Sequence, residues 1–259
     1  MGLWSKTVRI EQLTPADRSR MYEILSKYYE HVTEAQFLSD LSRKNAVILM
    51  RDTSKNRIQG FSTILDIRMK VEGRTVIGAF SGDTIVERAY WGQGTLGKAF
   101  LAYMLKQKLK NPFKTFYWFL ISKGYKTYLL MANNCPTHYP RHEKPTPAHV
   151  KAIMDRFYSE LYPGNYDAGE GVIAFNGPAC HLKTGVAAIE RGLADANPRI
   201  AYFAEKNPGW HKGNELACIA TITFAMPFAY QLKCLVKALR ASRALRWTPI
   251  GLKSSEVKS

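Results

Sequence analysis

The amino-acid sequence predicts an α/β protein, and two observations support this prediction. Runs that alternate polar and apolar residues, as strands do, are interspersed with runs whose apolar residues recur every three or four positions, as in helices. Two long strand-like runs, 58–71 and 74–86, are separated only by Glu72-Gly73, which indicates an antiparallel hairpin. The chain of 259 residues, 46% hydrophobic and 22% charged, is also large enough to bury a sizeable core.

The first part of the chain predicts a strand, two helices and a third strand before this hairpin. Residues 6–13 alternate polar and apolar side chains and predict the first strand. Thr14-Pro15 then supplies an N-cap and a first helical residue. A second short helix is predicted from Thr33, and the compact apolar run 46–50 predicts the next strand. Helical spacing in the first helix is seen at Met21, Ile24, Leu25 and Tyr28.

A glycine-rich loop follows the hairpin and opens a helix predicted at about 95–109, which ends at Asn111-Pro112. The aromatic run 113–122 is compatible with either a helix or a strand, and residues 125–132 predict a strand. Residues 133–147 are rich in Pro, His, Asn and Thr, so they predict a domain boundary or an active-site loop.

The second half continues the alternation of helices and strands. Its predicted elements are a helix at 148–161, a strand at 171–175, a helix at 185–193, strands at 200–203 and 216–224, and a basic amphipathic helix at about 228–246. We therefore expect residues 1–135 to form one domain and residues 136–259 an α/β extension. This extension either completes the same fold or is a degenerate repeat of it.

The formal net charge of +16 favours an anionic partner. From Arg88 to His142 the chain has no Asp or Glu, and it carries nine Lys and Arg residues there. A nucleotide cofactor, an acidic carrier protein, nucleic acid or an anionic membrane surface would each fit such a field. The alternative is a solvated basic face that only keeps the protein in solution.

Several classes of protein are disfavoured by what the sequence lacks. No apolar run is long enough to cross a bilayer and the first residues do not form a hydrophobic signal segment, so we expect a cytoplasmic protein. Four dispersed cysteines form no C-x-x-C pair, which disfavours a disulfide framework and predicts no metal site. Cys180-His181 is disfavoured as a nucleophile and base because neighbours in a chain seldom face each other. His138, His142 and His149 are interpreted as loop and surface residues that could line an acceptor pocket.

The loop 92–97, with the sequence Gly-Gln-Gly-Thr-Leu-Gly, is the main functional motif. Glycines let the backbone bend tightly and approach a ligand, while the N–H groups and dipole of the following helix attract an anion. A phosphate or diphosphate would therefore suit the loop, although the glycines could also form only a structural turn. The spacing also fits the dinucleotide fingerprint, but that motif expects an acidic residue about 20 positions later. None occurs before Glu143.

Residues 86–101, Val-Glu-Arg-Ala-Tyr-Trp-Gly-Gln-Gly-Thr-Leu-Gly-Lys-Ala-Phe-Leu, resemble the acyl-CoA-binding motif of the GNAT acyltransferase superfamily. The order of predicted elements over about residues 6–132 is similar to that family's core. The resemblance implies a GNAT-like mixed, partly antiparallel sheet flanked by helices, followed here by the C-terminal α/β extension. Trp91 departs from the Arg or Gln that usually precedes the glycines, and Gly97 lies one residue later than the family's last small residue.

The resemblance also implies the ligands. The donor would be acyl-CoA or acetyl-CoA, or alternatively an acyl carrier protein, and the acceptor a small-molecule amine. The implied donor-binding residues are Trp91, Gly92, Gln93, Gly94, Thr95, Gly97 and Lys98.

GNAT chemistry implies direct attack of the amine on a thioester. Such a site needs a base for the ammonium, donors for the thioester oxygen and an acid for the leaving thiolate. Glu87 is the first candidate for the base and Asp83 the second, with Tyr139 as the candidate acid. Glu87 could instead pair with Arg88, and Tyr139 could only line a wall.

Two rival functions remain open from the sequence. The first is a nucleic-acid-binding protein without catalysis, in which an aromatic run among lysines would stack bases. That run, which is also compatible with core packing or an acyl-chain tunnel, comprises Phe113, Phe116, Tyr117, Trp118 and Phe119. The second is an NAD-type oxidoreductase, disfavoured by the missing acidic residue. Lys233, Lys237 and Arg240 on the last predicted helix could contact an acidic carrier or an anionic membrane.

Overall fold

The computed structural model describes residues 2–175, 181–182, 189 and 191–228. The chain divides into two compact units, residues 1–223 and 224–259, and the elements below belong to the first. The predicted helix at 228–246, the predicted helix at 185–193, Cys180 and Cys234 lie wholly or largely outside the described residues.

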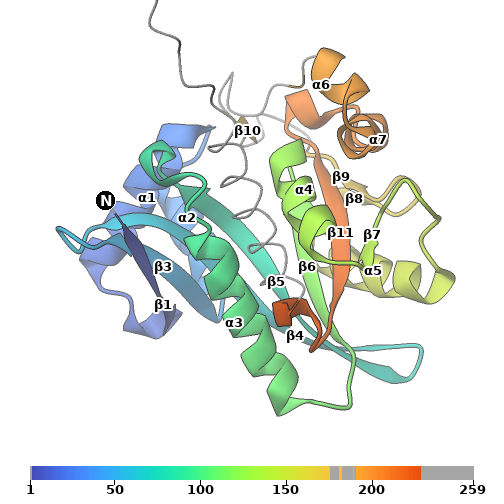
Figure 1. Ribbon diagram of the computed structural model, residues 1–259, viewed down its shortest axis with the longest axis horizontal. Helices are drawn as coiled ribbons and strands as arrows, with labels where there is room; N and C mark the ends of the chain where they lie inside the picture. The colour runs from blue at the N-terminus through green and yellow to red at the C-terminus, as the bar shows by residue number, and fades with distance from the viewer. Residues whose placement is uncertain (1, 176–180, 183–188, 190, 229–259) are drawn as a thin grey trace, which may run out of the picture. The chain divides into compact units, whose positions relative to one another are not determined.

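One nine-stranded sheet forms the centre of the described fold, in the order β1-β3-β4-β5-β6-β11-β9-β8, with β7 also paired to β11 (Figure 1). Its strands are β1 Leu3–Arg9, β3 Ala46–Asp52, β4 Ile58–Val71, β5 Arg74–Val86, β6 Phe116–Ser122, β7 His138–Tyr139, β8 Tyr166–Asp167, β9 Val172–Ile173 and β11 Glu215–Ile222. Two further short strands, β2 Tyr29–Glu30 and β10 His181–Leu182, pair with each other.

The β5–β6 pair is parallel, and the other described pairs of the sheet are antiparallel. The predicted mixed, partly antiparallel sheet is therefore confirmed. Strands from both predicted halves lie in this one sheet, because β11 pairs with every residue of β6. The division at residue 135 itself stays a prediction.

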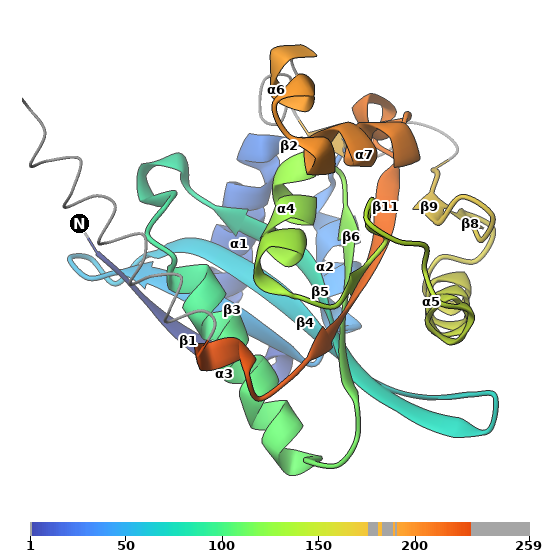
Figure 2. The same cartoon turned by 45° about the vertical axis from the view of Figure 1, so that its right-hand side comes forward.

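Helices cover both faces of the sheet. They are α1 Pro15–Tyr28, α2 Glu34–Ser42, α3 Thr95–Lys110, α4 Tyr125–Asn134, α5 Ala148–Leu161, α6 Arg191–Asp195 and α7 Pro198–Lys206. The ring of Trp118 on β6 contacts Phe100 of α3, whereas the neighbouring Phe119 contacts Phe157 of α5. Successive strand residues point to opposite faces, so α3 and α5 lie on opposite sides of the sheet. Figures 1 and 2 show α3 and α4 on one face and α1, α2 and α5 on the other.

Local signals in the sequence account for several element ends. Thr14 caps α1 by accepting a hydrogen bond from the Asp17 N–H at 3.1 Å, and Pro15 is the first helical residue. Thr33 caps α2 in the same way through the Gln36 N–H. The predicted hairpin turn is confirmed, with φ of 48° at Glu72 and 75° at Gly73. The first strand starts earlier than predicted and ends at Arg9, where a 3-10 turn takes over.

Two predicted strands are wrong. Residues 125–132 belong to α4 and residues 200–203 to α7. Both are short apolar runs, in which helix and strand periodicity cannot be told apart. The start of α7 nevertheless carries a recognisable signal, because the Asn197 side chain accepts from the Arg199 N–H and Pro198 is the first helical residue.

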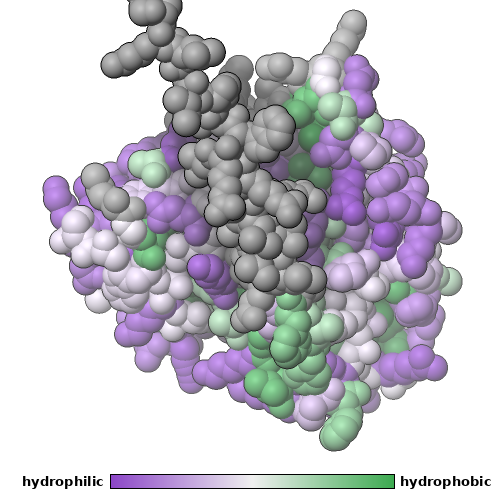
Figure 3. Space-filling model, in the orientation of Figure 1, coloured by the Kyte–Doolittle hydropathy of each residue, from purple (hydrophilic) through white to green (hydrophobic). Residues whose placement is uncertain are grey.

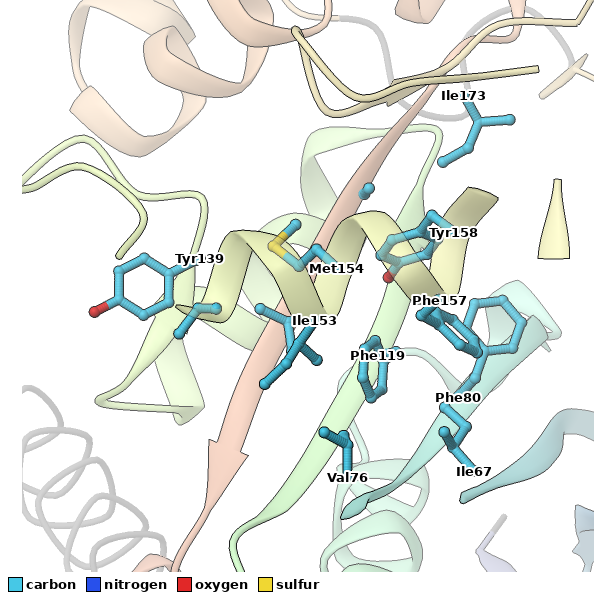
Figure 4. Packing of buried hydrophobic residues seen from close by; sticks show 13 residues of the cluster. Ile67, Val76, Phe80, Phe119, Tyr139, Ile153, Met154, Phe157, Tyr158 and Ile173 are labelled. Carbon is cyan, nitrogen blue, oxygen red and sulfur yellow. The ribbon is translucent and has the colours of Figure 1, made fainter. Parts of the chain in front are cut away.

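Two hydrophobic clusters hold the helices on one face of the sheet. The first packs α1 and α2 against β3, β4 and β5. The second packs α5 against β5, β6 and β11, with Phe119 and Phe157 at its centre (Figure 4). The hydroxyl of Tyr158 lies 2.8 Å from the Leu120 carbonyl and 2.7 Å from that of Cys218, which fixes α5 across two strands.

Hydrophilic side chains occupy much of the surface in view in Figure 3. Among the described residues no helix combines the length and the apolarity needed to cross a bilayer.

Candidate functional site

The parallel pairing between β5 and β6 ends before either strand does. Its ladder runs from Ile77–Phe116 to Ser81–Leu120. Beyond it, β5 continues to Val86 paired with β4, and β6 continues to Ser122 paired with β11. The two strands therefore separate at their carboxyl ends, and each leads toward the N-terminus of a helix, α3 or α4. Ligands of α/β proteins commonly bind at such an edge.

A β-bulge distorts β5 where this separation begins. Ser62 pairs with Thr84 and Ile64 with Ser81, so Thr63 of β4 faces both Gly82 and Asp83. A side chain at Gly82 would not fit, because an added Cβ would lie 2.5 Å from the Thr63 hydroxyl oxygen. Bulges redirect side chains and are common beside active sites. Here the redirected carboxylic acid is Asp83.

Several ionisable side chains from other elements act electrostatically on Asp83, and we call Asp83 and four of them the Asp83 cluster. The members are Lys44, Asp83, Lys123, Tyr162 and Glu215. Lys123 follows β6 and its ammonium lies 3.3 Å from the Glu215 carboxylate. The Lys44 ammonium lies 5.3 Å from the centre of the Phe80 ring, and the Lys123 ammonium 5.3 Å from that of Tyr29.

The Asp83 cluster lies on the face that carries α5. Tyr162 directly follows α5, and Phe80, beneath Lys44, packs against Phe157 of that helix. Glu215 lies two residues before Ala217 on β11, so the two side chains point to the same face of the sheet. Ala217 belongs to the hydrophobic cluster under α5. The cluster is thus on the face opposite α3.

Burial shifts the pKa values of this cluster. It raises the pKa of Asp83, against the opposing effect of the positive charges of Lys44 and Lys123. Burial likewise raises the pKa of Glu215 and lowers that of Lys44. A carboxyl group whose pKa moves up toward neutrality is better matched to taking up and returning a proton.

Glu87, the first candidate for the base, has different surroundings. Its carboxylate accepts hydrogen bonds from the Lys27 ammonium at 2.6 Å and the Tyr28 hydroxyl at 2.8 Å, while Arg20 lies 3.5 Å away. Burial of the carboxyl opposes ionisation, but the bonds from Lys27 and Tyr28 outweigh it and lower the pKa of Glu87. This arrangement connects the end of β5 to α1. Hydrogen bonds thus lower the pKa of Glu87, whereas burial raises that of Asp83.

We expect Glu87→Gln to lower stability more than activity. Loss of the charge-assisted bonds should reduce the free energy of unfolding by about 1–3 kcal/mol at pH 7. Because folding lowers the pKa of Glu87 below its usual 4.5, the stabilisation is present above that pH and is lost as the pH falls through the folded-state pKa. Urea unfolding of wild type and variant at several pH values measures the difference.

Glu160→Gln is the matched control for this prediction. Its pair with Arg156, at 3.1 Å, is also an ion pair to a helix residue, but both side chains are largely exposed. Glu160→Gln should lower the free energy of unfolding by less than about 1 kcal/mol. A Glu87→Gln protein as stable as wild type at pH 7 would contradict the structural role.

Tyr139, the candidate acid, is buried on β7 opposite Ile219 of β11 and belongs to the cluster under α5. Figure 4 shows it at one end of α5, with Tyr158 toward the other. Tyr162, of the Asp83 cluster, follows that other end. A helix of 14 residues is about 20 Å long. Tyr139 and the Asp83 cluster are therefore not brought together, and the proposal that Tyr139 is the acid has no geometric support.

The glycine loop opens α3 at the carboxyl end of β5. Gly92 and Gly94 have φ of 83° and 73°, which non-glycine residues rarely adopt, and Gly94 is the N-cap residue. The Lys98 N–H bonds to the Gly94 carbonyl, so the N–H groups of Thr95, Leu96 and Gly97 precede the intrahelical ladder. Gly92, Gln93 and Gly94 are exposed, as is Lys98 in the first turn of α3. The loop therefore has the geometry that binds phosphate groups.

Trp91 precedes this loop and is held in place. Its indole N–H donates to the Val86 carbonyl at 2.7 Å, and 46% of the residue is exposed. The Arg88 guanidinium lies 5.7 Å and the Lys126 ammonium 5.1 Å from the ring centre. Lys126 is in the first turn of α4, so this contact joins the two helix N-termini that follow β5 and β6.

The remaining candidates from the sequence are the aromatic run and the histidines. Phe116, Trp118 and Phe119 are buried in the sheet, whereas Phe113 is fully exposed. The aromatic run is thus mainly core and not a stacking platform. His138 is buried, contrary to the interpretation as a surface residue, and its Nδ1 lies 2.8 Å from the Cys135 carbonyl. Within the described part of the chain, no three His, Cys, Asp or Glu side chains form a group that could hold a metal ion.

Sequence reasoning missed Lys44, Lys123, Glu215, Arg88 and Lys126. Lys44 and Glu215 carry no local motif, since they reach Asp83 only when β3, β5 and β11 enter one sheet. The acid-free stretch from residue 88 to residue 142 was a signal for Arg88, Lys123 and Lys126 as a group, without singling any of them out.

The described part of the chain has antiparallel strands, a bulged strand paired in parallel with the next, and a glycine loop and helix between those two. These features agree with the mixed, partly antiparallel sheet that the sequence resemblance implies.

Solved structures that are similar to part of the chain include several acyltransferases. A probable N-acyltransferase from Enterococcus faecalis is 18% identical, with a TM-score of 0.38, over 49% of this chain and 31% of its own. An IAA acetyltransferase from Bacillus cereus is 13% identical, with a TM-score of 0.34, over 51% of this chain and 75% of its own. A GNAT family N-acetyltransferase from Escherichia coli in complex with CoA is 16% identical, with a TM-score of 0.33, over 48% of this chain and 65% of its own.

These identities and TM-scores are too low to transfer any of those proteins' ligands or activities to this chain. The chain also spans about a third of the length of the Enterococcus protein. No family model matches the sequence, and no curated protein matches it.

Proposed function

We propose that this protein is an acyltransferase that moves an acyl group from a thioester to an amine by direct attack. One observation carries the proposal. The exposed glycine loop and the bulge that holds Asp83 lie at the same end of the parallel strands β5 and β6, where those strands separate. An exposed glycine loop and a half-buried carboxyl group are thereby available to a single ligand pair.

The loop supports a donor that carries a diphosphate. Three N–H groups at the start of α3 and the positive end of its dipole stabilise negative charge. Lys98, in the same turn, adds a positive charge. Acyl-CoA or acetyl-CoA is the donor that fits these groups, and an acyl carrier protein is the alternative.

The opposite face of the sheet supports the acceptor. The loop opens α3 on one face, whereas the Asp83 cluster lies on the face of α5. Donor and acceptor would therefore approach the separated strands from opposite sides. This disposition allows the amine to attack the thioester without a covalent enzyme intermediate.

In the proposed reaction, Asp83 takes a proton from the acceptor ammonium, and the neutral nitrogen attacks the thioester carbon. The C–N bond forms and the C–S bond breaks, and the electron pair of that bond leaves with sulfur. The thiolate takes up a proton, which Asp83 or solvent supplies. Backbone N–H groups of β5 beyond Ser81, where the ladder to β6 has ended, are candidates to stabilise the oxyanion.

A panel of acyl thioesters and amines tests this function directly. The purified protein should release free thiol and form an amide with at least one pair, and free CoA should raise its melting temperature. The thioester without amine measures background hydrolysis. Neither amide formation nor stabilisation by CoA, across acetyl, medium-chain and long-chain donors, would overturn the proposal.

Donor binding should also weaken as salt increases. Raising the ionic strength from about 0.05 M to about 0.5 M shortens the Debye length and screens the attraction between the donor phosphates and the cations near the loop. The dissociation constant of CoA, measured by titration calorimetry, should rise several-fold. If CoA binding barely changes while binding of single-stranded RNA falls steeply with salt, the nucleic-acid interpretation is favoured.

A further inference from the structure

We propose that Arg88, Trp91 and Lys126 form a subsite for the 3′-phosphate of a CoA donor, so that the protein uses CoA thioesters in preference to carrier-protein thioesters. We call these three residues the Trp91 clamp. The inference rests on the proposed function and specifies its donor.

The clamp is assembled from two elements that meet only in the folded chain. Arg88 begins the 3-10 turn after β5, and Lys126 lies in the first turn of α4 after β6. Both cations contact the same indole, at 5.7 Å and 5.1 Å from its centre. The hydrogen bond from the indole to the Val86 carbonyl fixes the ring, and the ring in turn restricts where the two charges can lie.

Electrostatics indicates an anion at this position. Two positive charges held around one ring attract a negative charge more strongly than either of them does alone. The acid-free stretch from residue 88 to residue 142 includes both cations of the clamp. Arg88, Trp91 and Lys126 are all exposed, so a doubly charged phosphate can reach them from solvent.

The position along the chain identifies the phosphate. Trp91 immediately precedes Gly92, and the N–H groups that would take the diphosphate follow within six residues. CoA carries a third phosphate on its ribose, close to the diphosphate, whereas the prosthetic group of a carrier protein has a single phosphate and no nucleotide. The clamp therefore supplies charge that a CoA donor can use and a phosphopantetheine arm cannot.

Binding of CoA and of 3′-dephospho-CoA tests this assignment. By titration calorimetry, wild-type protein should bind CoA about tenfold more tightly than 3′-dephospho-CoA. The double variant Arg88→Gln, Lys126→Gln should lose that preference, because its affinity for CoA falls while its affinity for 3′-dephospho-CoA stays near that of wild type. The double variant Lys110→Gln, Lys114→Gln is charge-matched and should keep the preference, because Lys110 ends α3 and Lys114 lies beyond that end.

The outcomes separate this inference from the proposed function. Equal affinity of wild type for the two ligands overturns the clamp, even if the protein proves to be an acyltransferase. A clamp variant that binds CoA and 3′-dephospho-CoA with equally reduced affinity also overturns the clamp. In that case the two positive charges act only through the general positive potential of the protein. A preference for CoA that the clamp variant abolishes supports the subsite, whether or not amide formation is detected.

Discussion

Replacing Asp83 with Asn should reduce acyl transfer by roughly 10²–10⁴-fold, the usual contribution of a general base, with little change in the affinity for CoA. The substitution keeps the size of the side chain and removes its basicity. Burial raises the pKa of Asp83, so the active, ionised form should appear only as the pH rises through that raised value. Wild-type turnover should therefore increase with pH through one ionisation, and the variant should lose this dependence.

Stability provides the control that separates catalysis from folding. A carboxyl group whose pKa is raised in the folded state reduces stability as the pH rises through that value, so Asp83→Asn should unfold at the same or a higher temperature than wild type at pH 8. Asp66→Asn, on the neighbouring strand β4 and bonded to the Tyr103 hydroxyl, should keep full turnover. If Asp83→Asn retains wild-type turnover and pH profile, the base is another group and Glu87 is the next to test.

Replacing Gly94 with Val should abolish detectable binding of CoA. Gly94 has φ of 73° at the N-cap of α3, a conformation that costs a β-branched residue the most, and the new side chain would occupy the place where a phosphate meets the helix N-terminus. CoA at 100 times its dissociation constant should stabilise wild type by about 2.7 kcal/mol and the variant not at all. Thermal unfolding with and without CoA measures both values.

Gly164→Val is the matched control for the loop variant. Gly164 also has a positive φ, 77°, and nothing lies within 4 Å of an added Cβ. Gly164→Val therefore introduces similar backbone strain outside the glycine loop. This variant should lower the melting temperature of the free protein without changing the increase in melting temperature that CoA causes. Normal CoA binding by Gly94→Val would mean that the loop is a structural turn.

The correct parts of the sequence prediction share a physical basis. The cap at Thr14-Pro15, the hairpin turn at Glu72-Gly73 and the glycine loop before α3 are confirmed because each depends on residues that are neighbours in the chain. Long periodic runs such as 58–71 and 148–161 are recovered with their observed bounds. The strand predictions for 125–132 and 200–203 were wrong because a short apolar segment packs equally well as a strand or as one face of a helix.

The ranking of Glu87 and Asp83 as candidate bases could not be predicted from residues that are neighbours in the chain. Lys27 and Tyr28 approach Glu87 only because the end of α1 packs beside the end of β5, and their hydrogen bonds lower its pKa. The opposite shift at Asp83 results from burial at a bulge. A pKa depends on desolvation and on charges a few ångströms away, and neither quantity is local in sequence.

The sequence by itself determined the class of fold, the hairpin, the glycine loop before α3 and the acid-free stretch from residue 88 to residue 142, because these follow from chain neighbours and composition. Only the tertiary structure decided that Lys123 and Glu215 pair near Asp83, and that Arg88 and Lys126 meet at one indole. Those contacts arise where β5 and β6 separate and β11 completes the sheet, and strand order is set by packing of the whole chain.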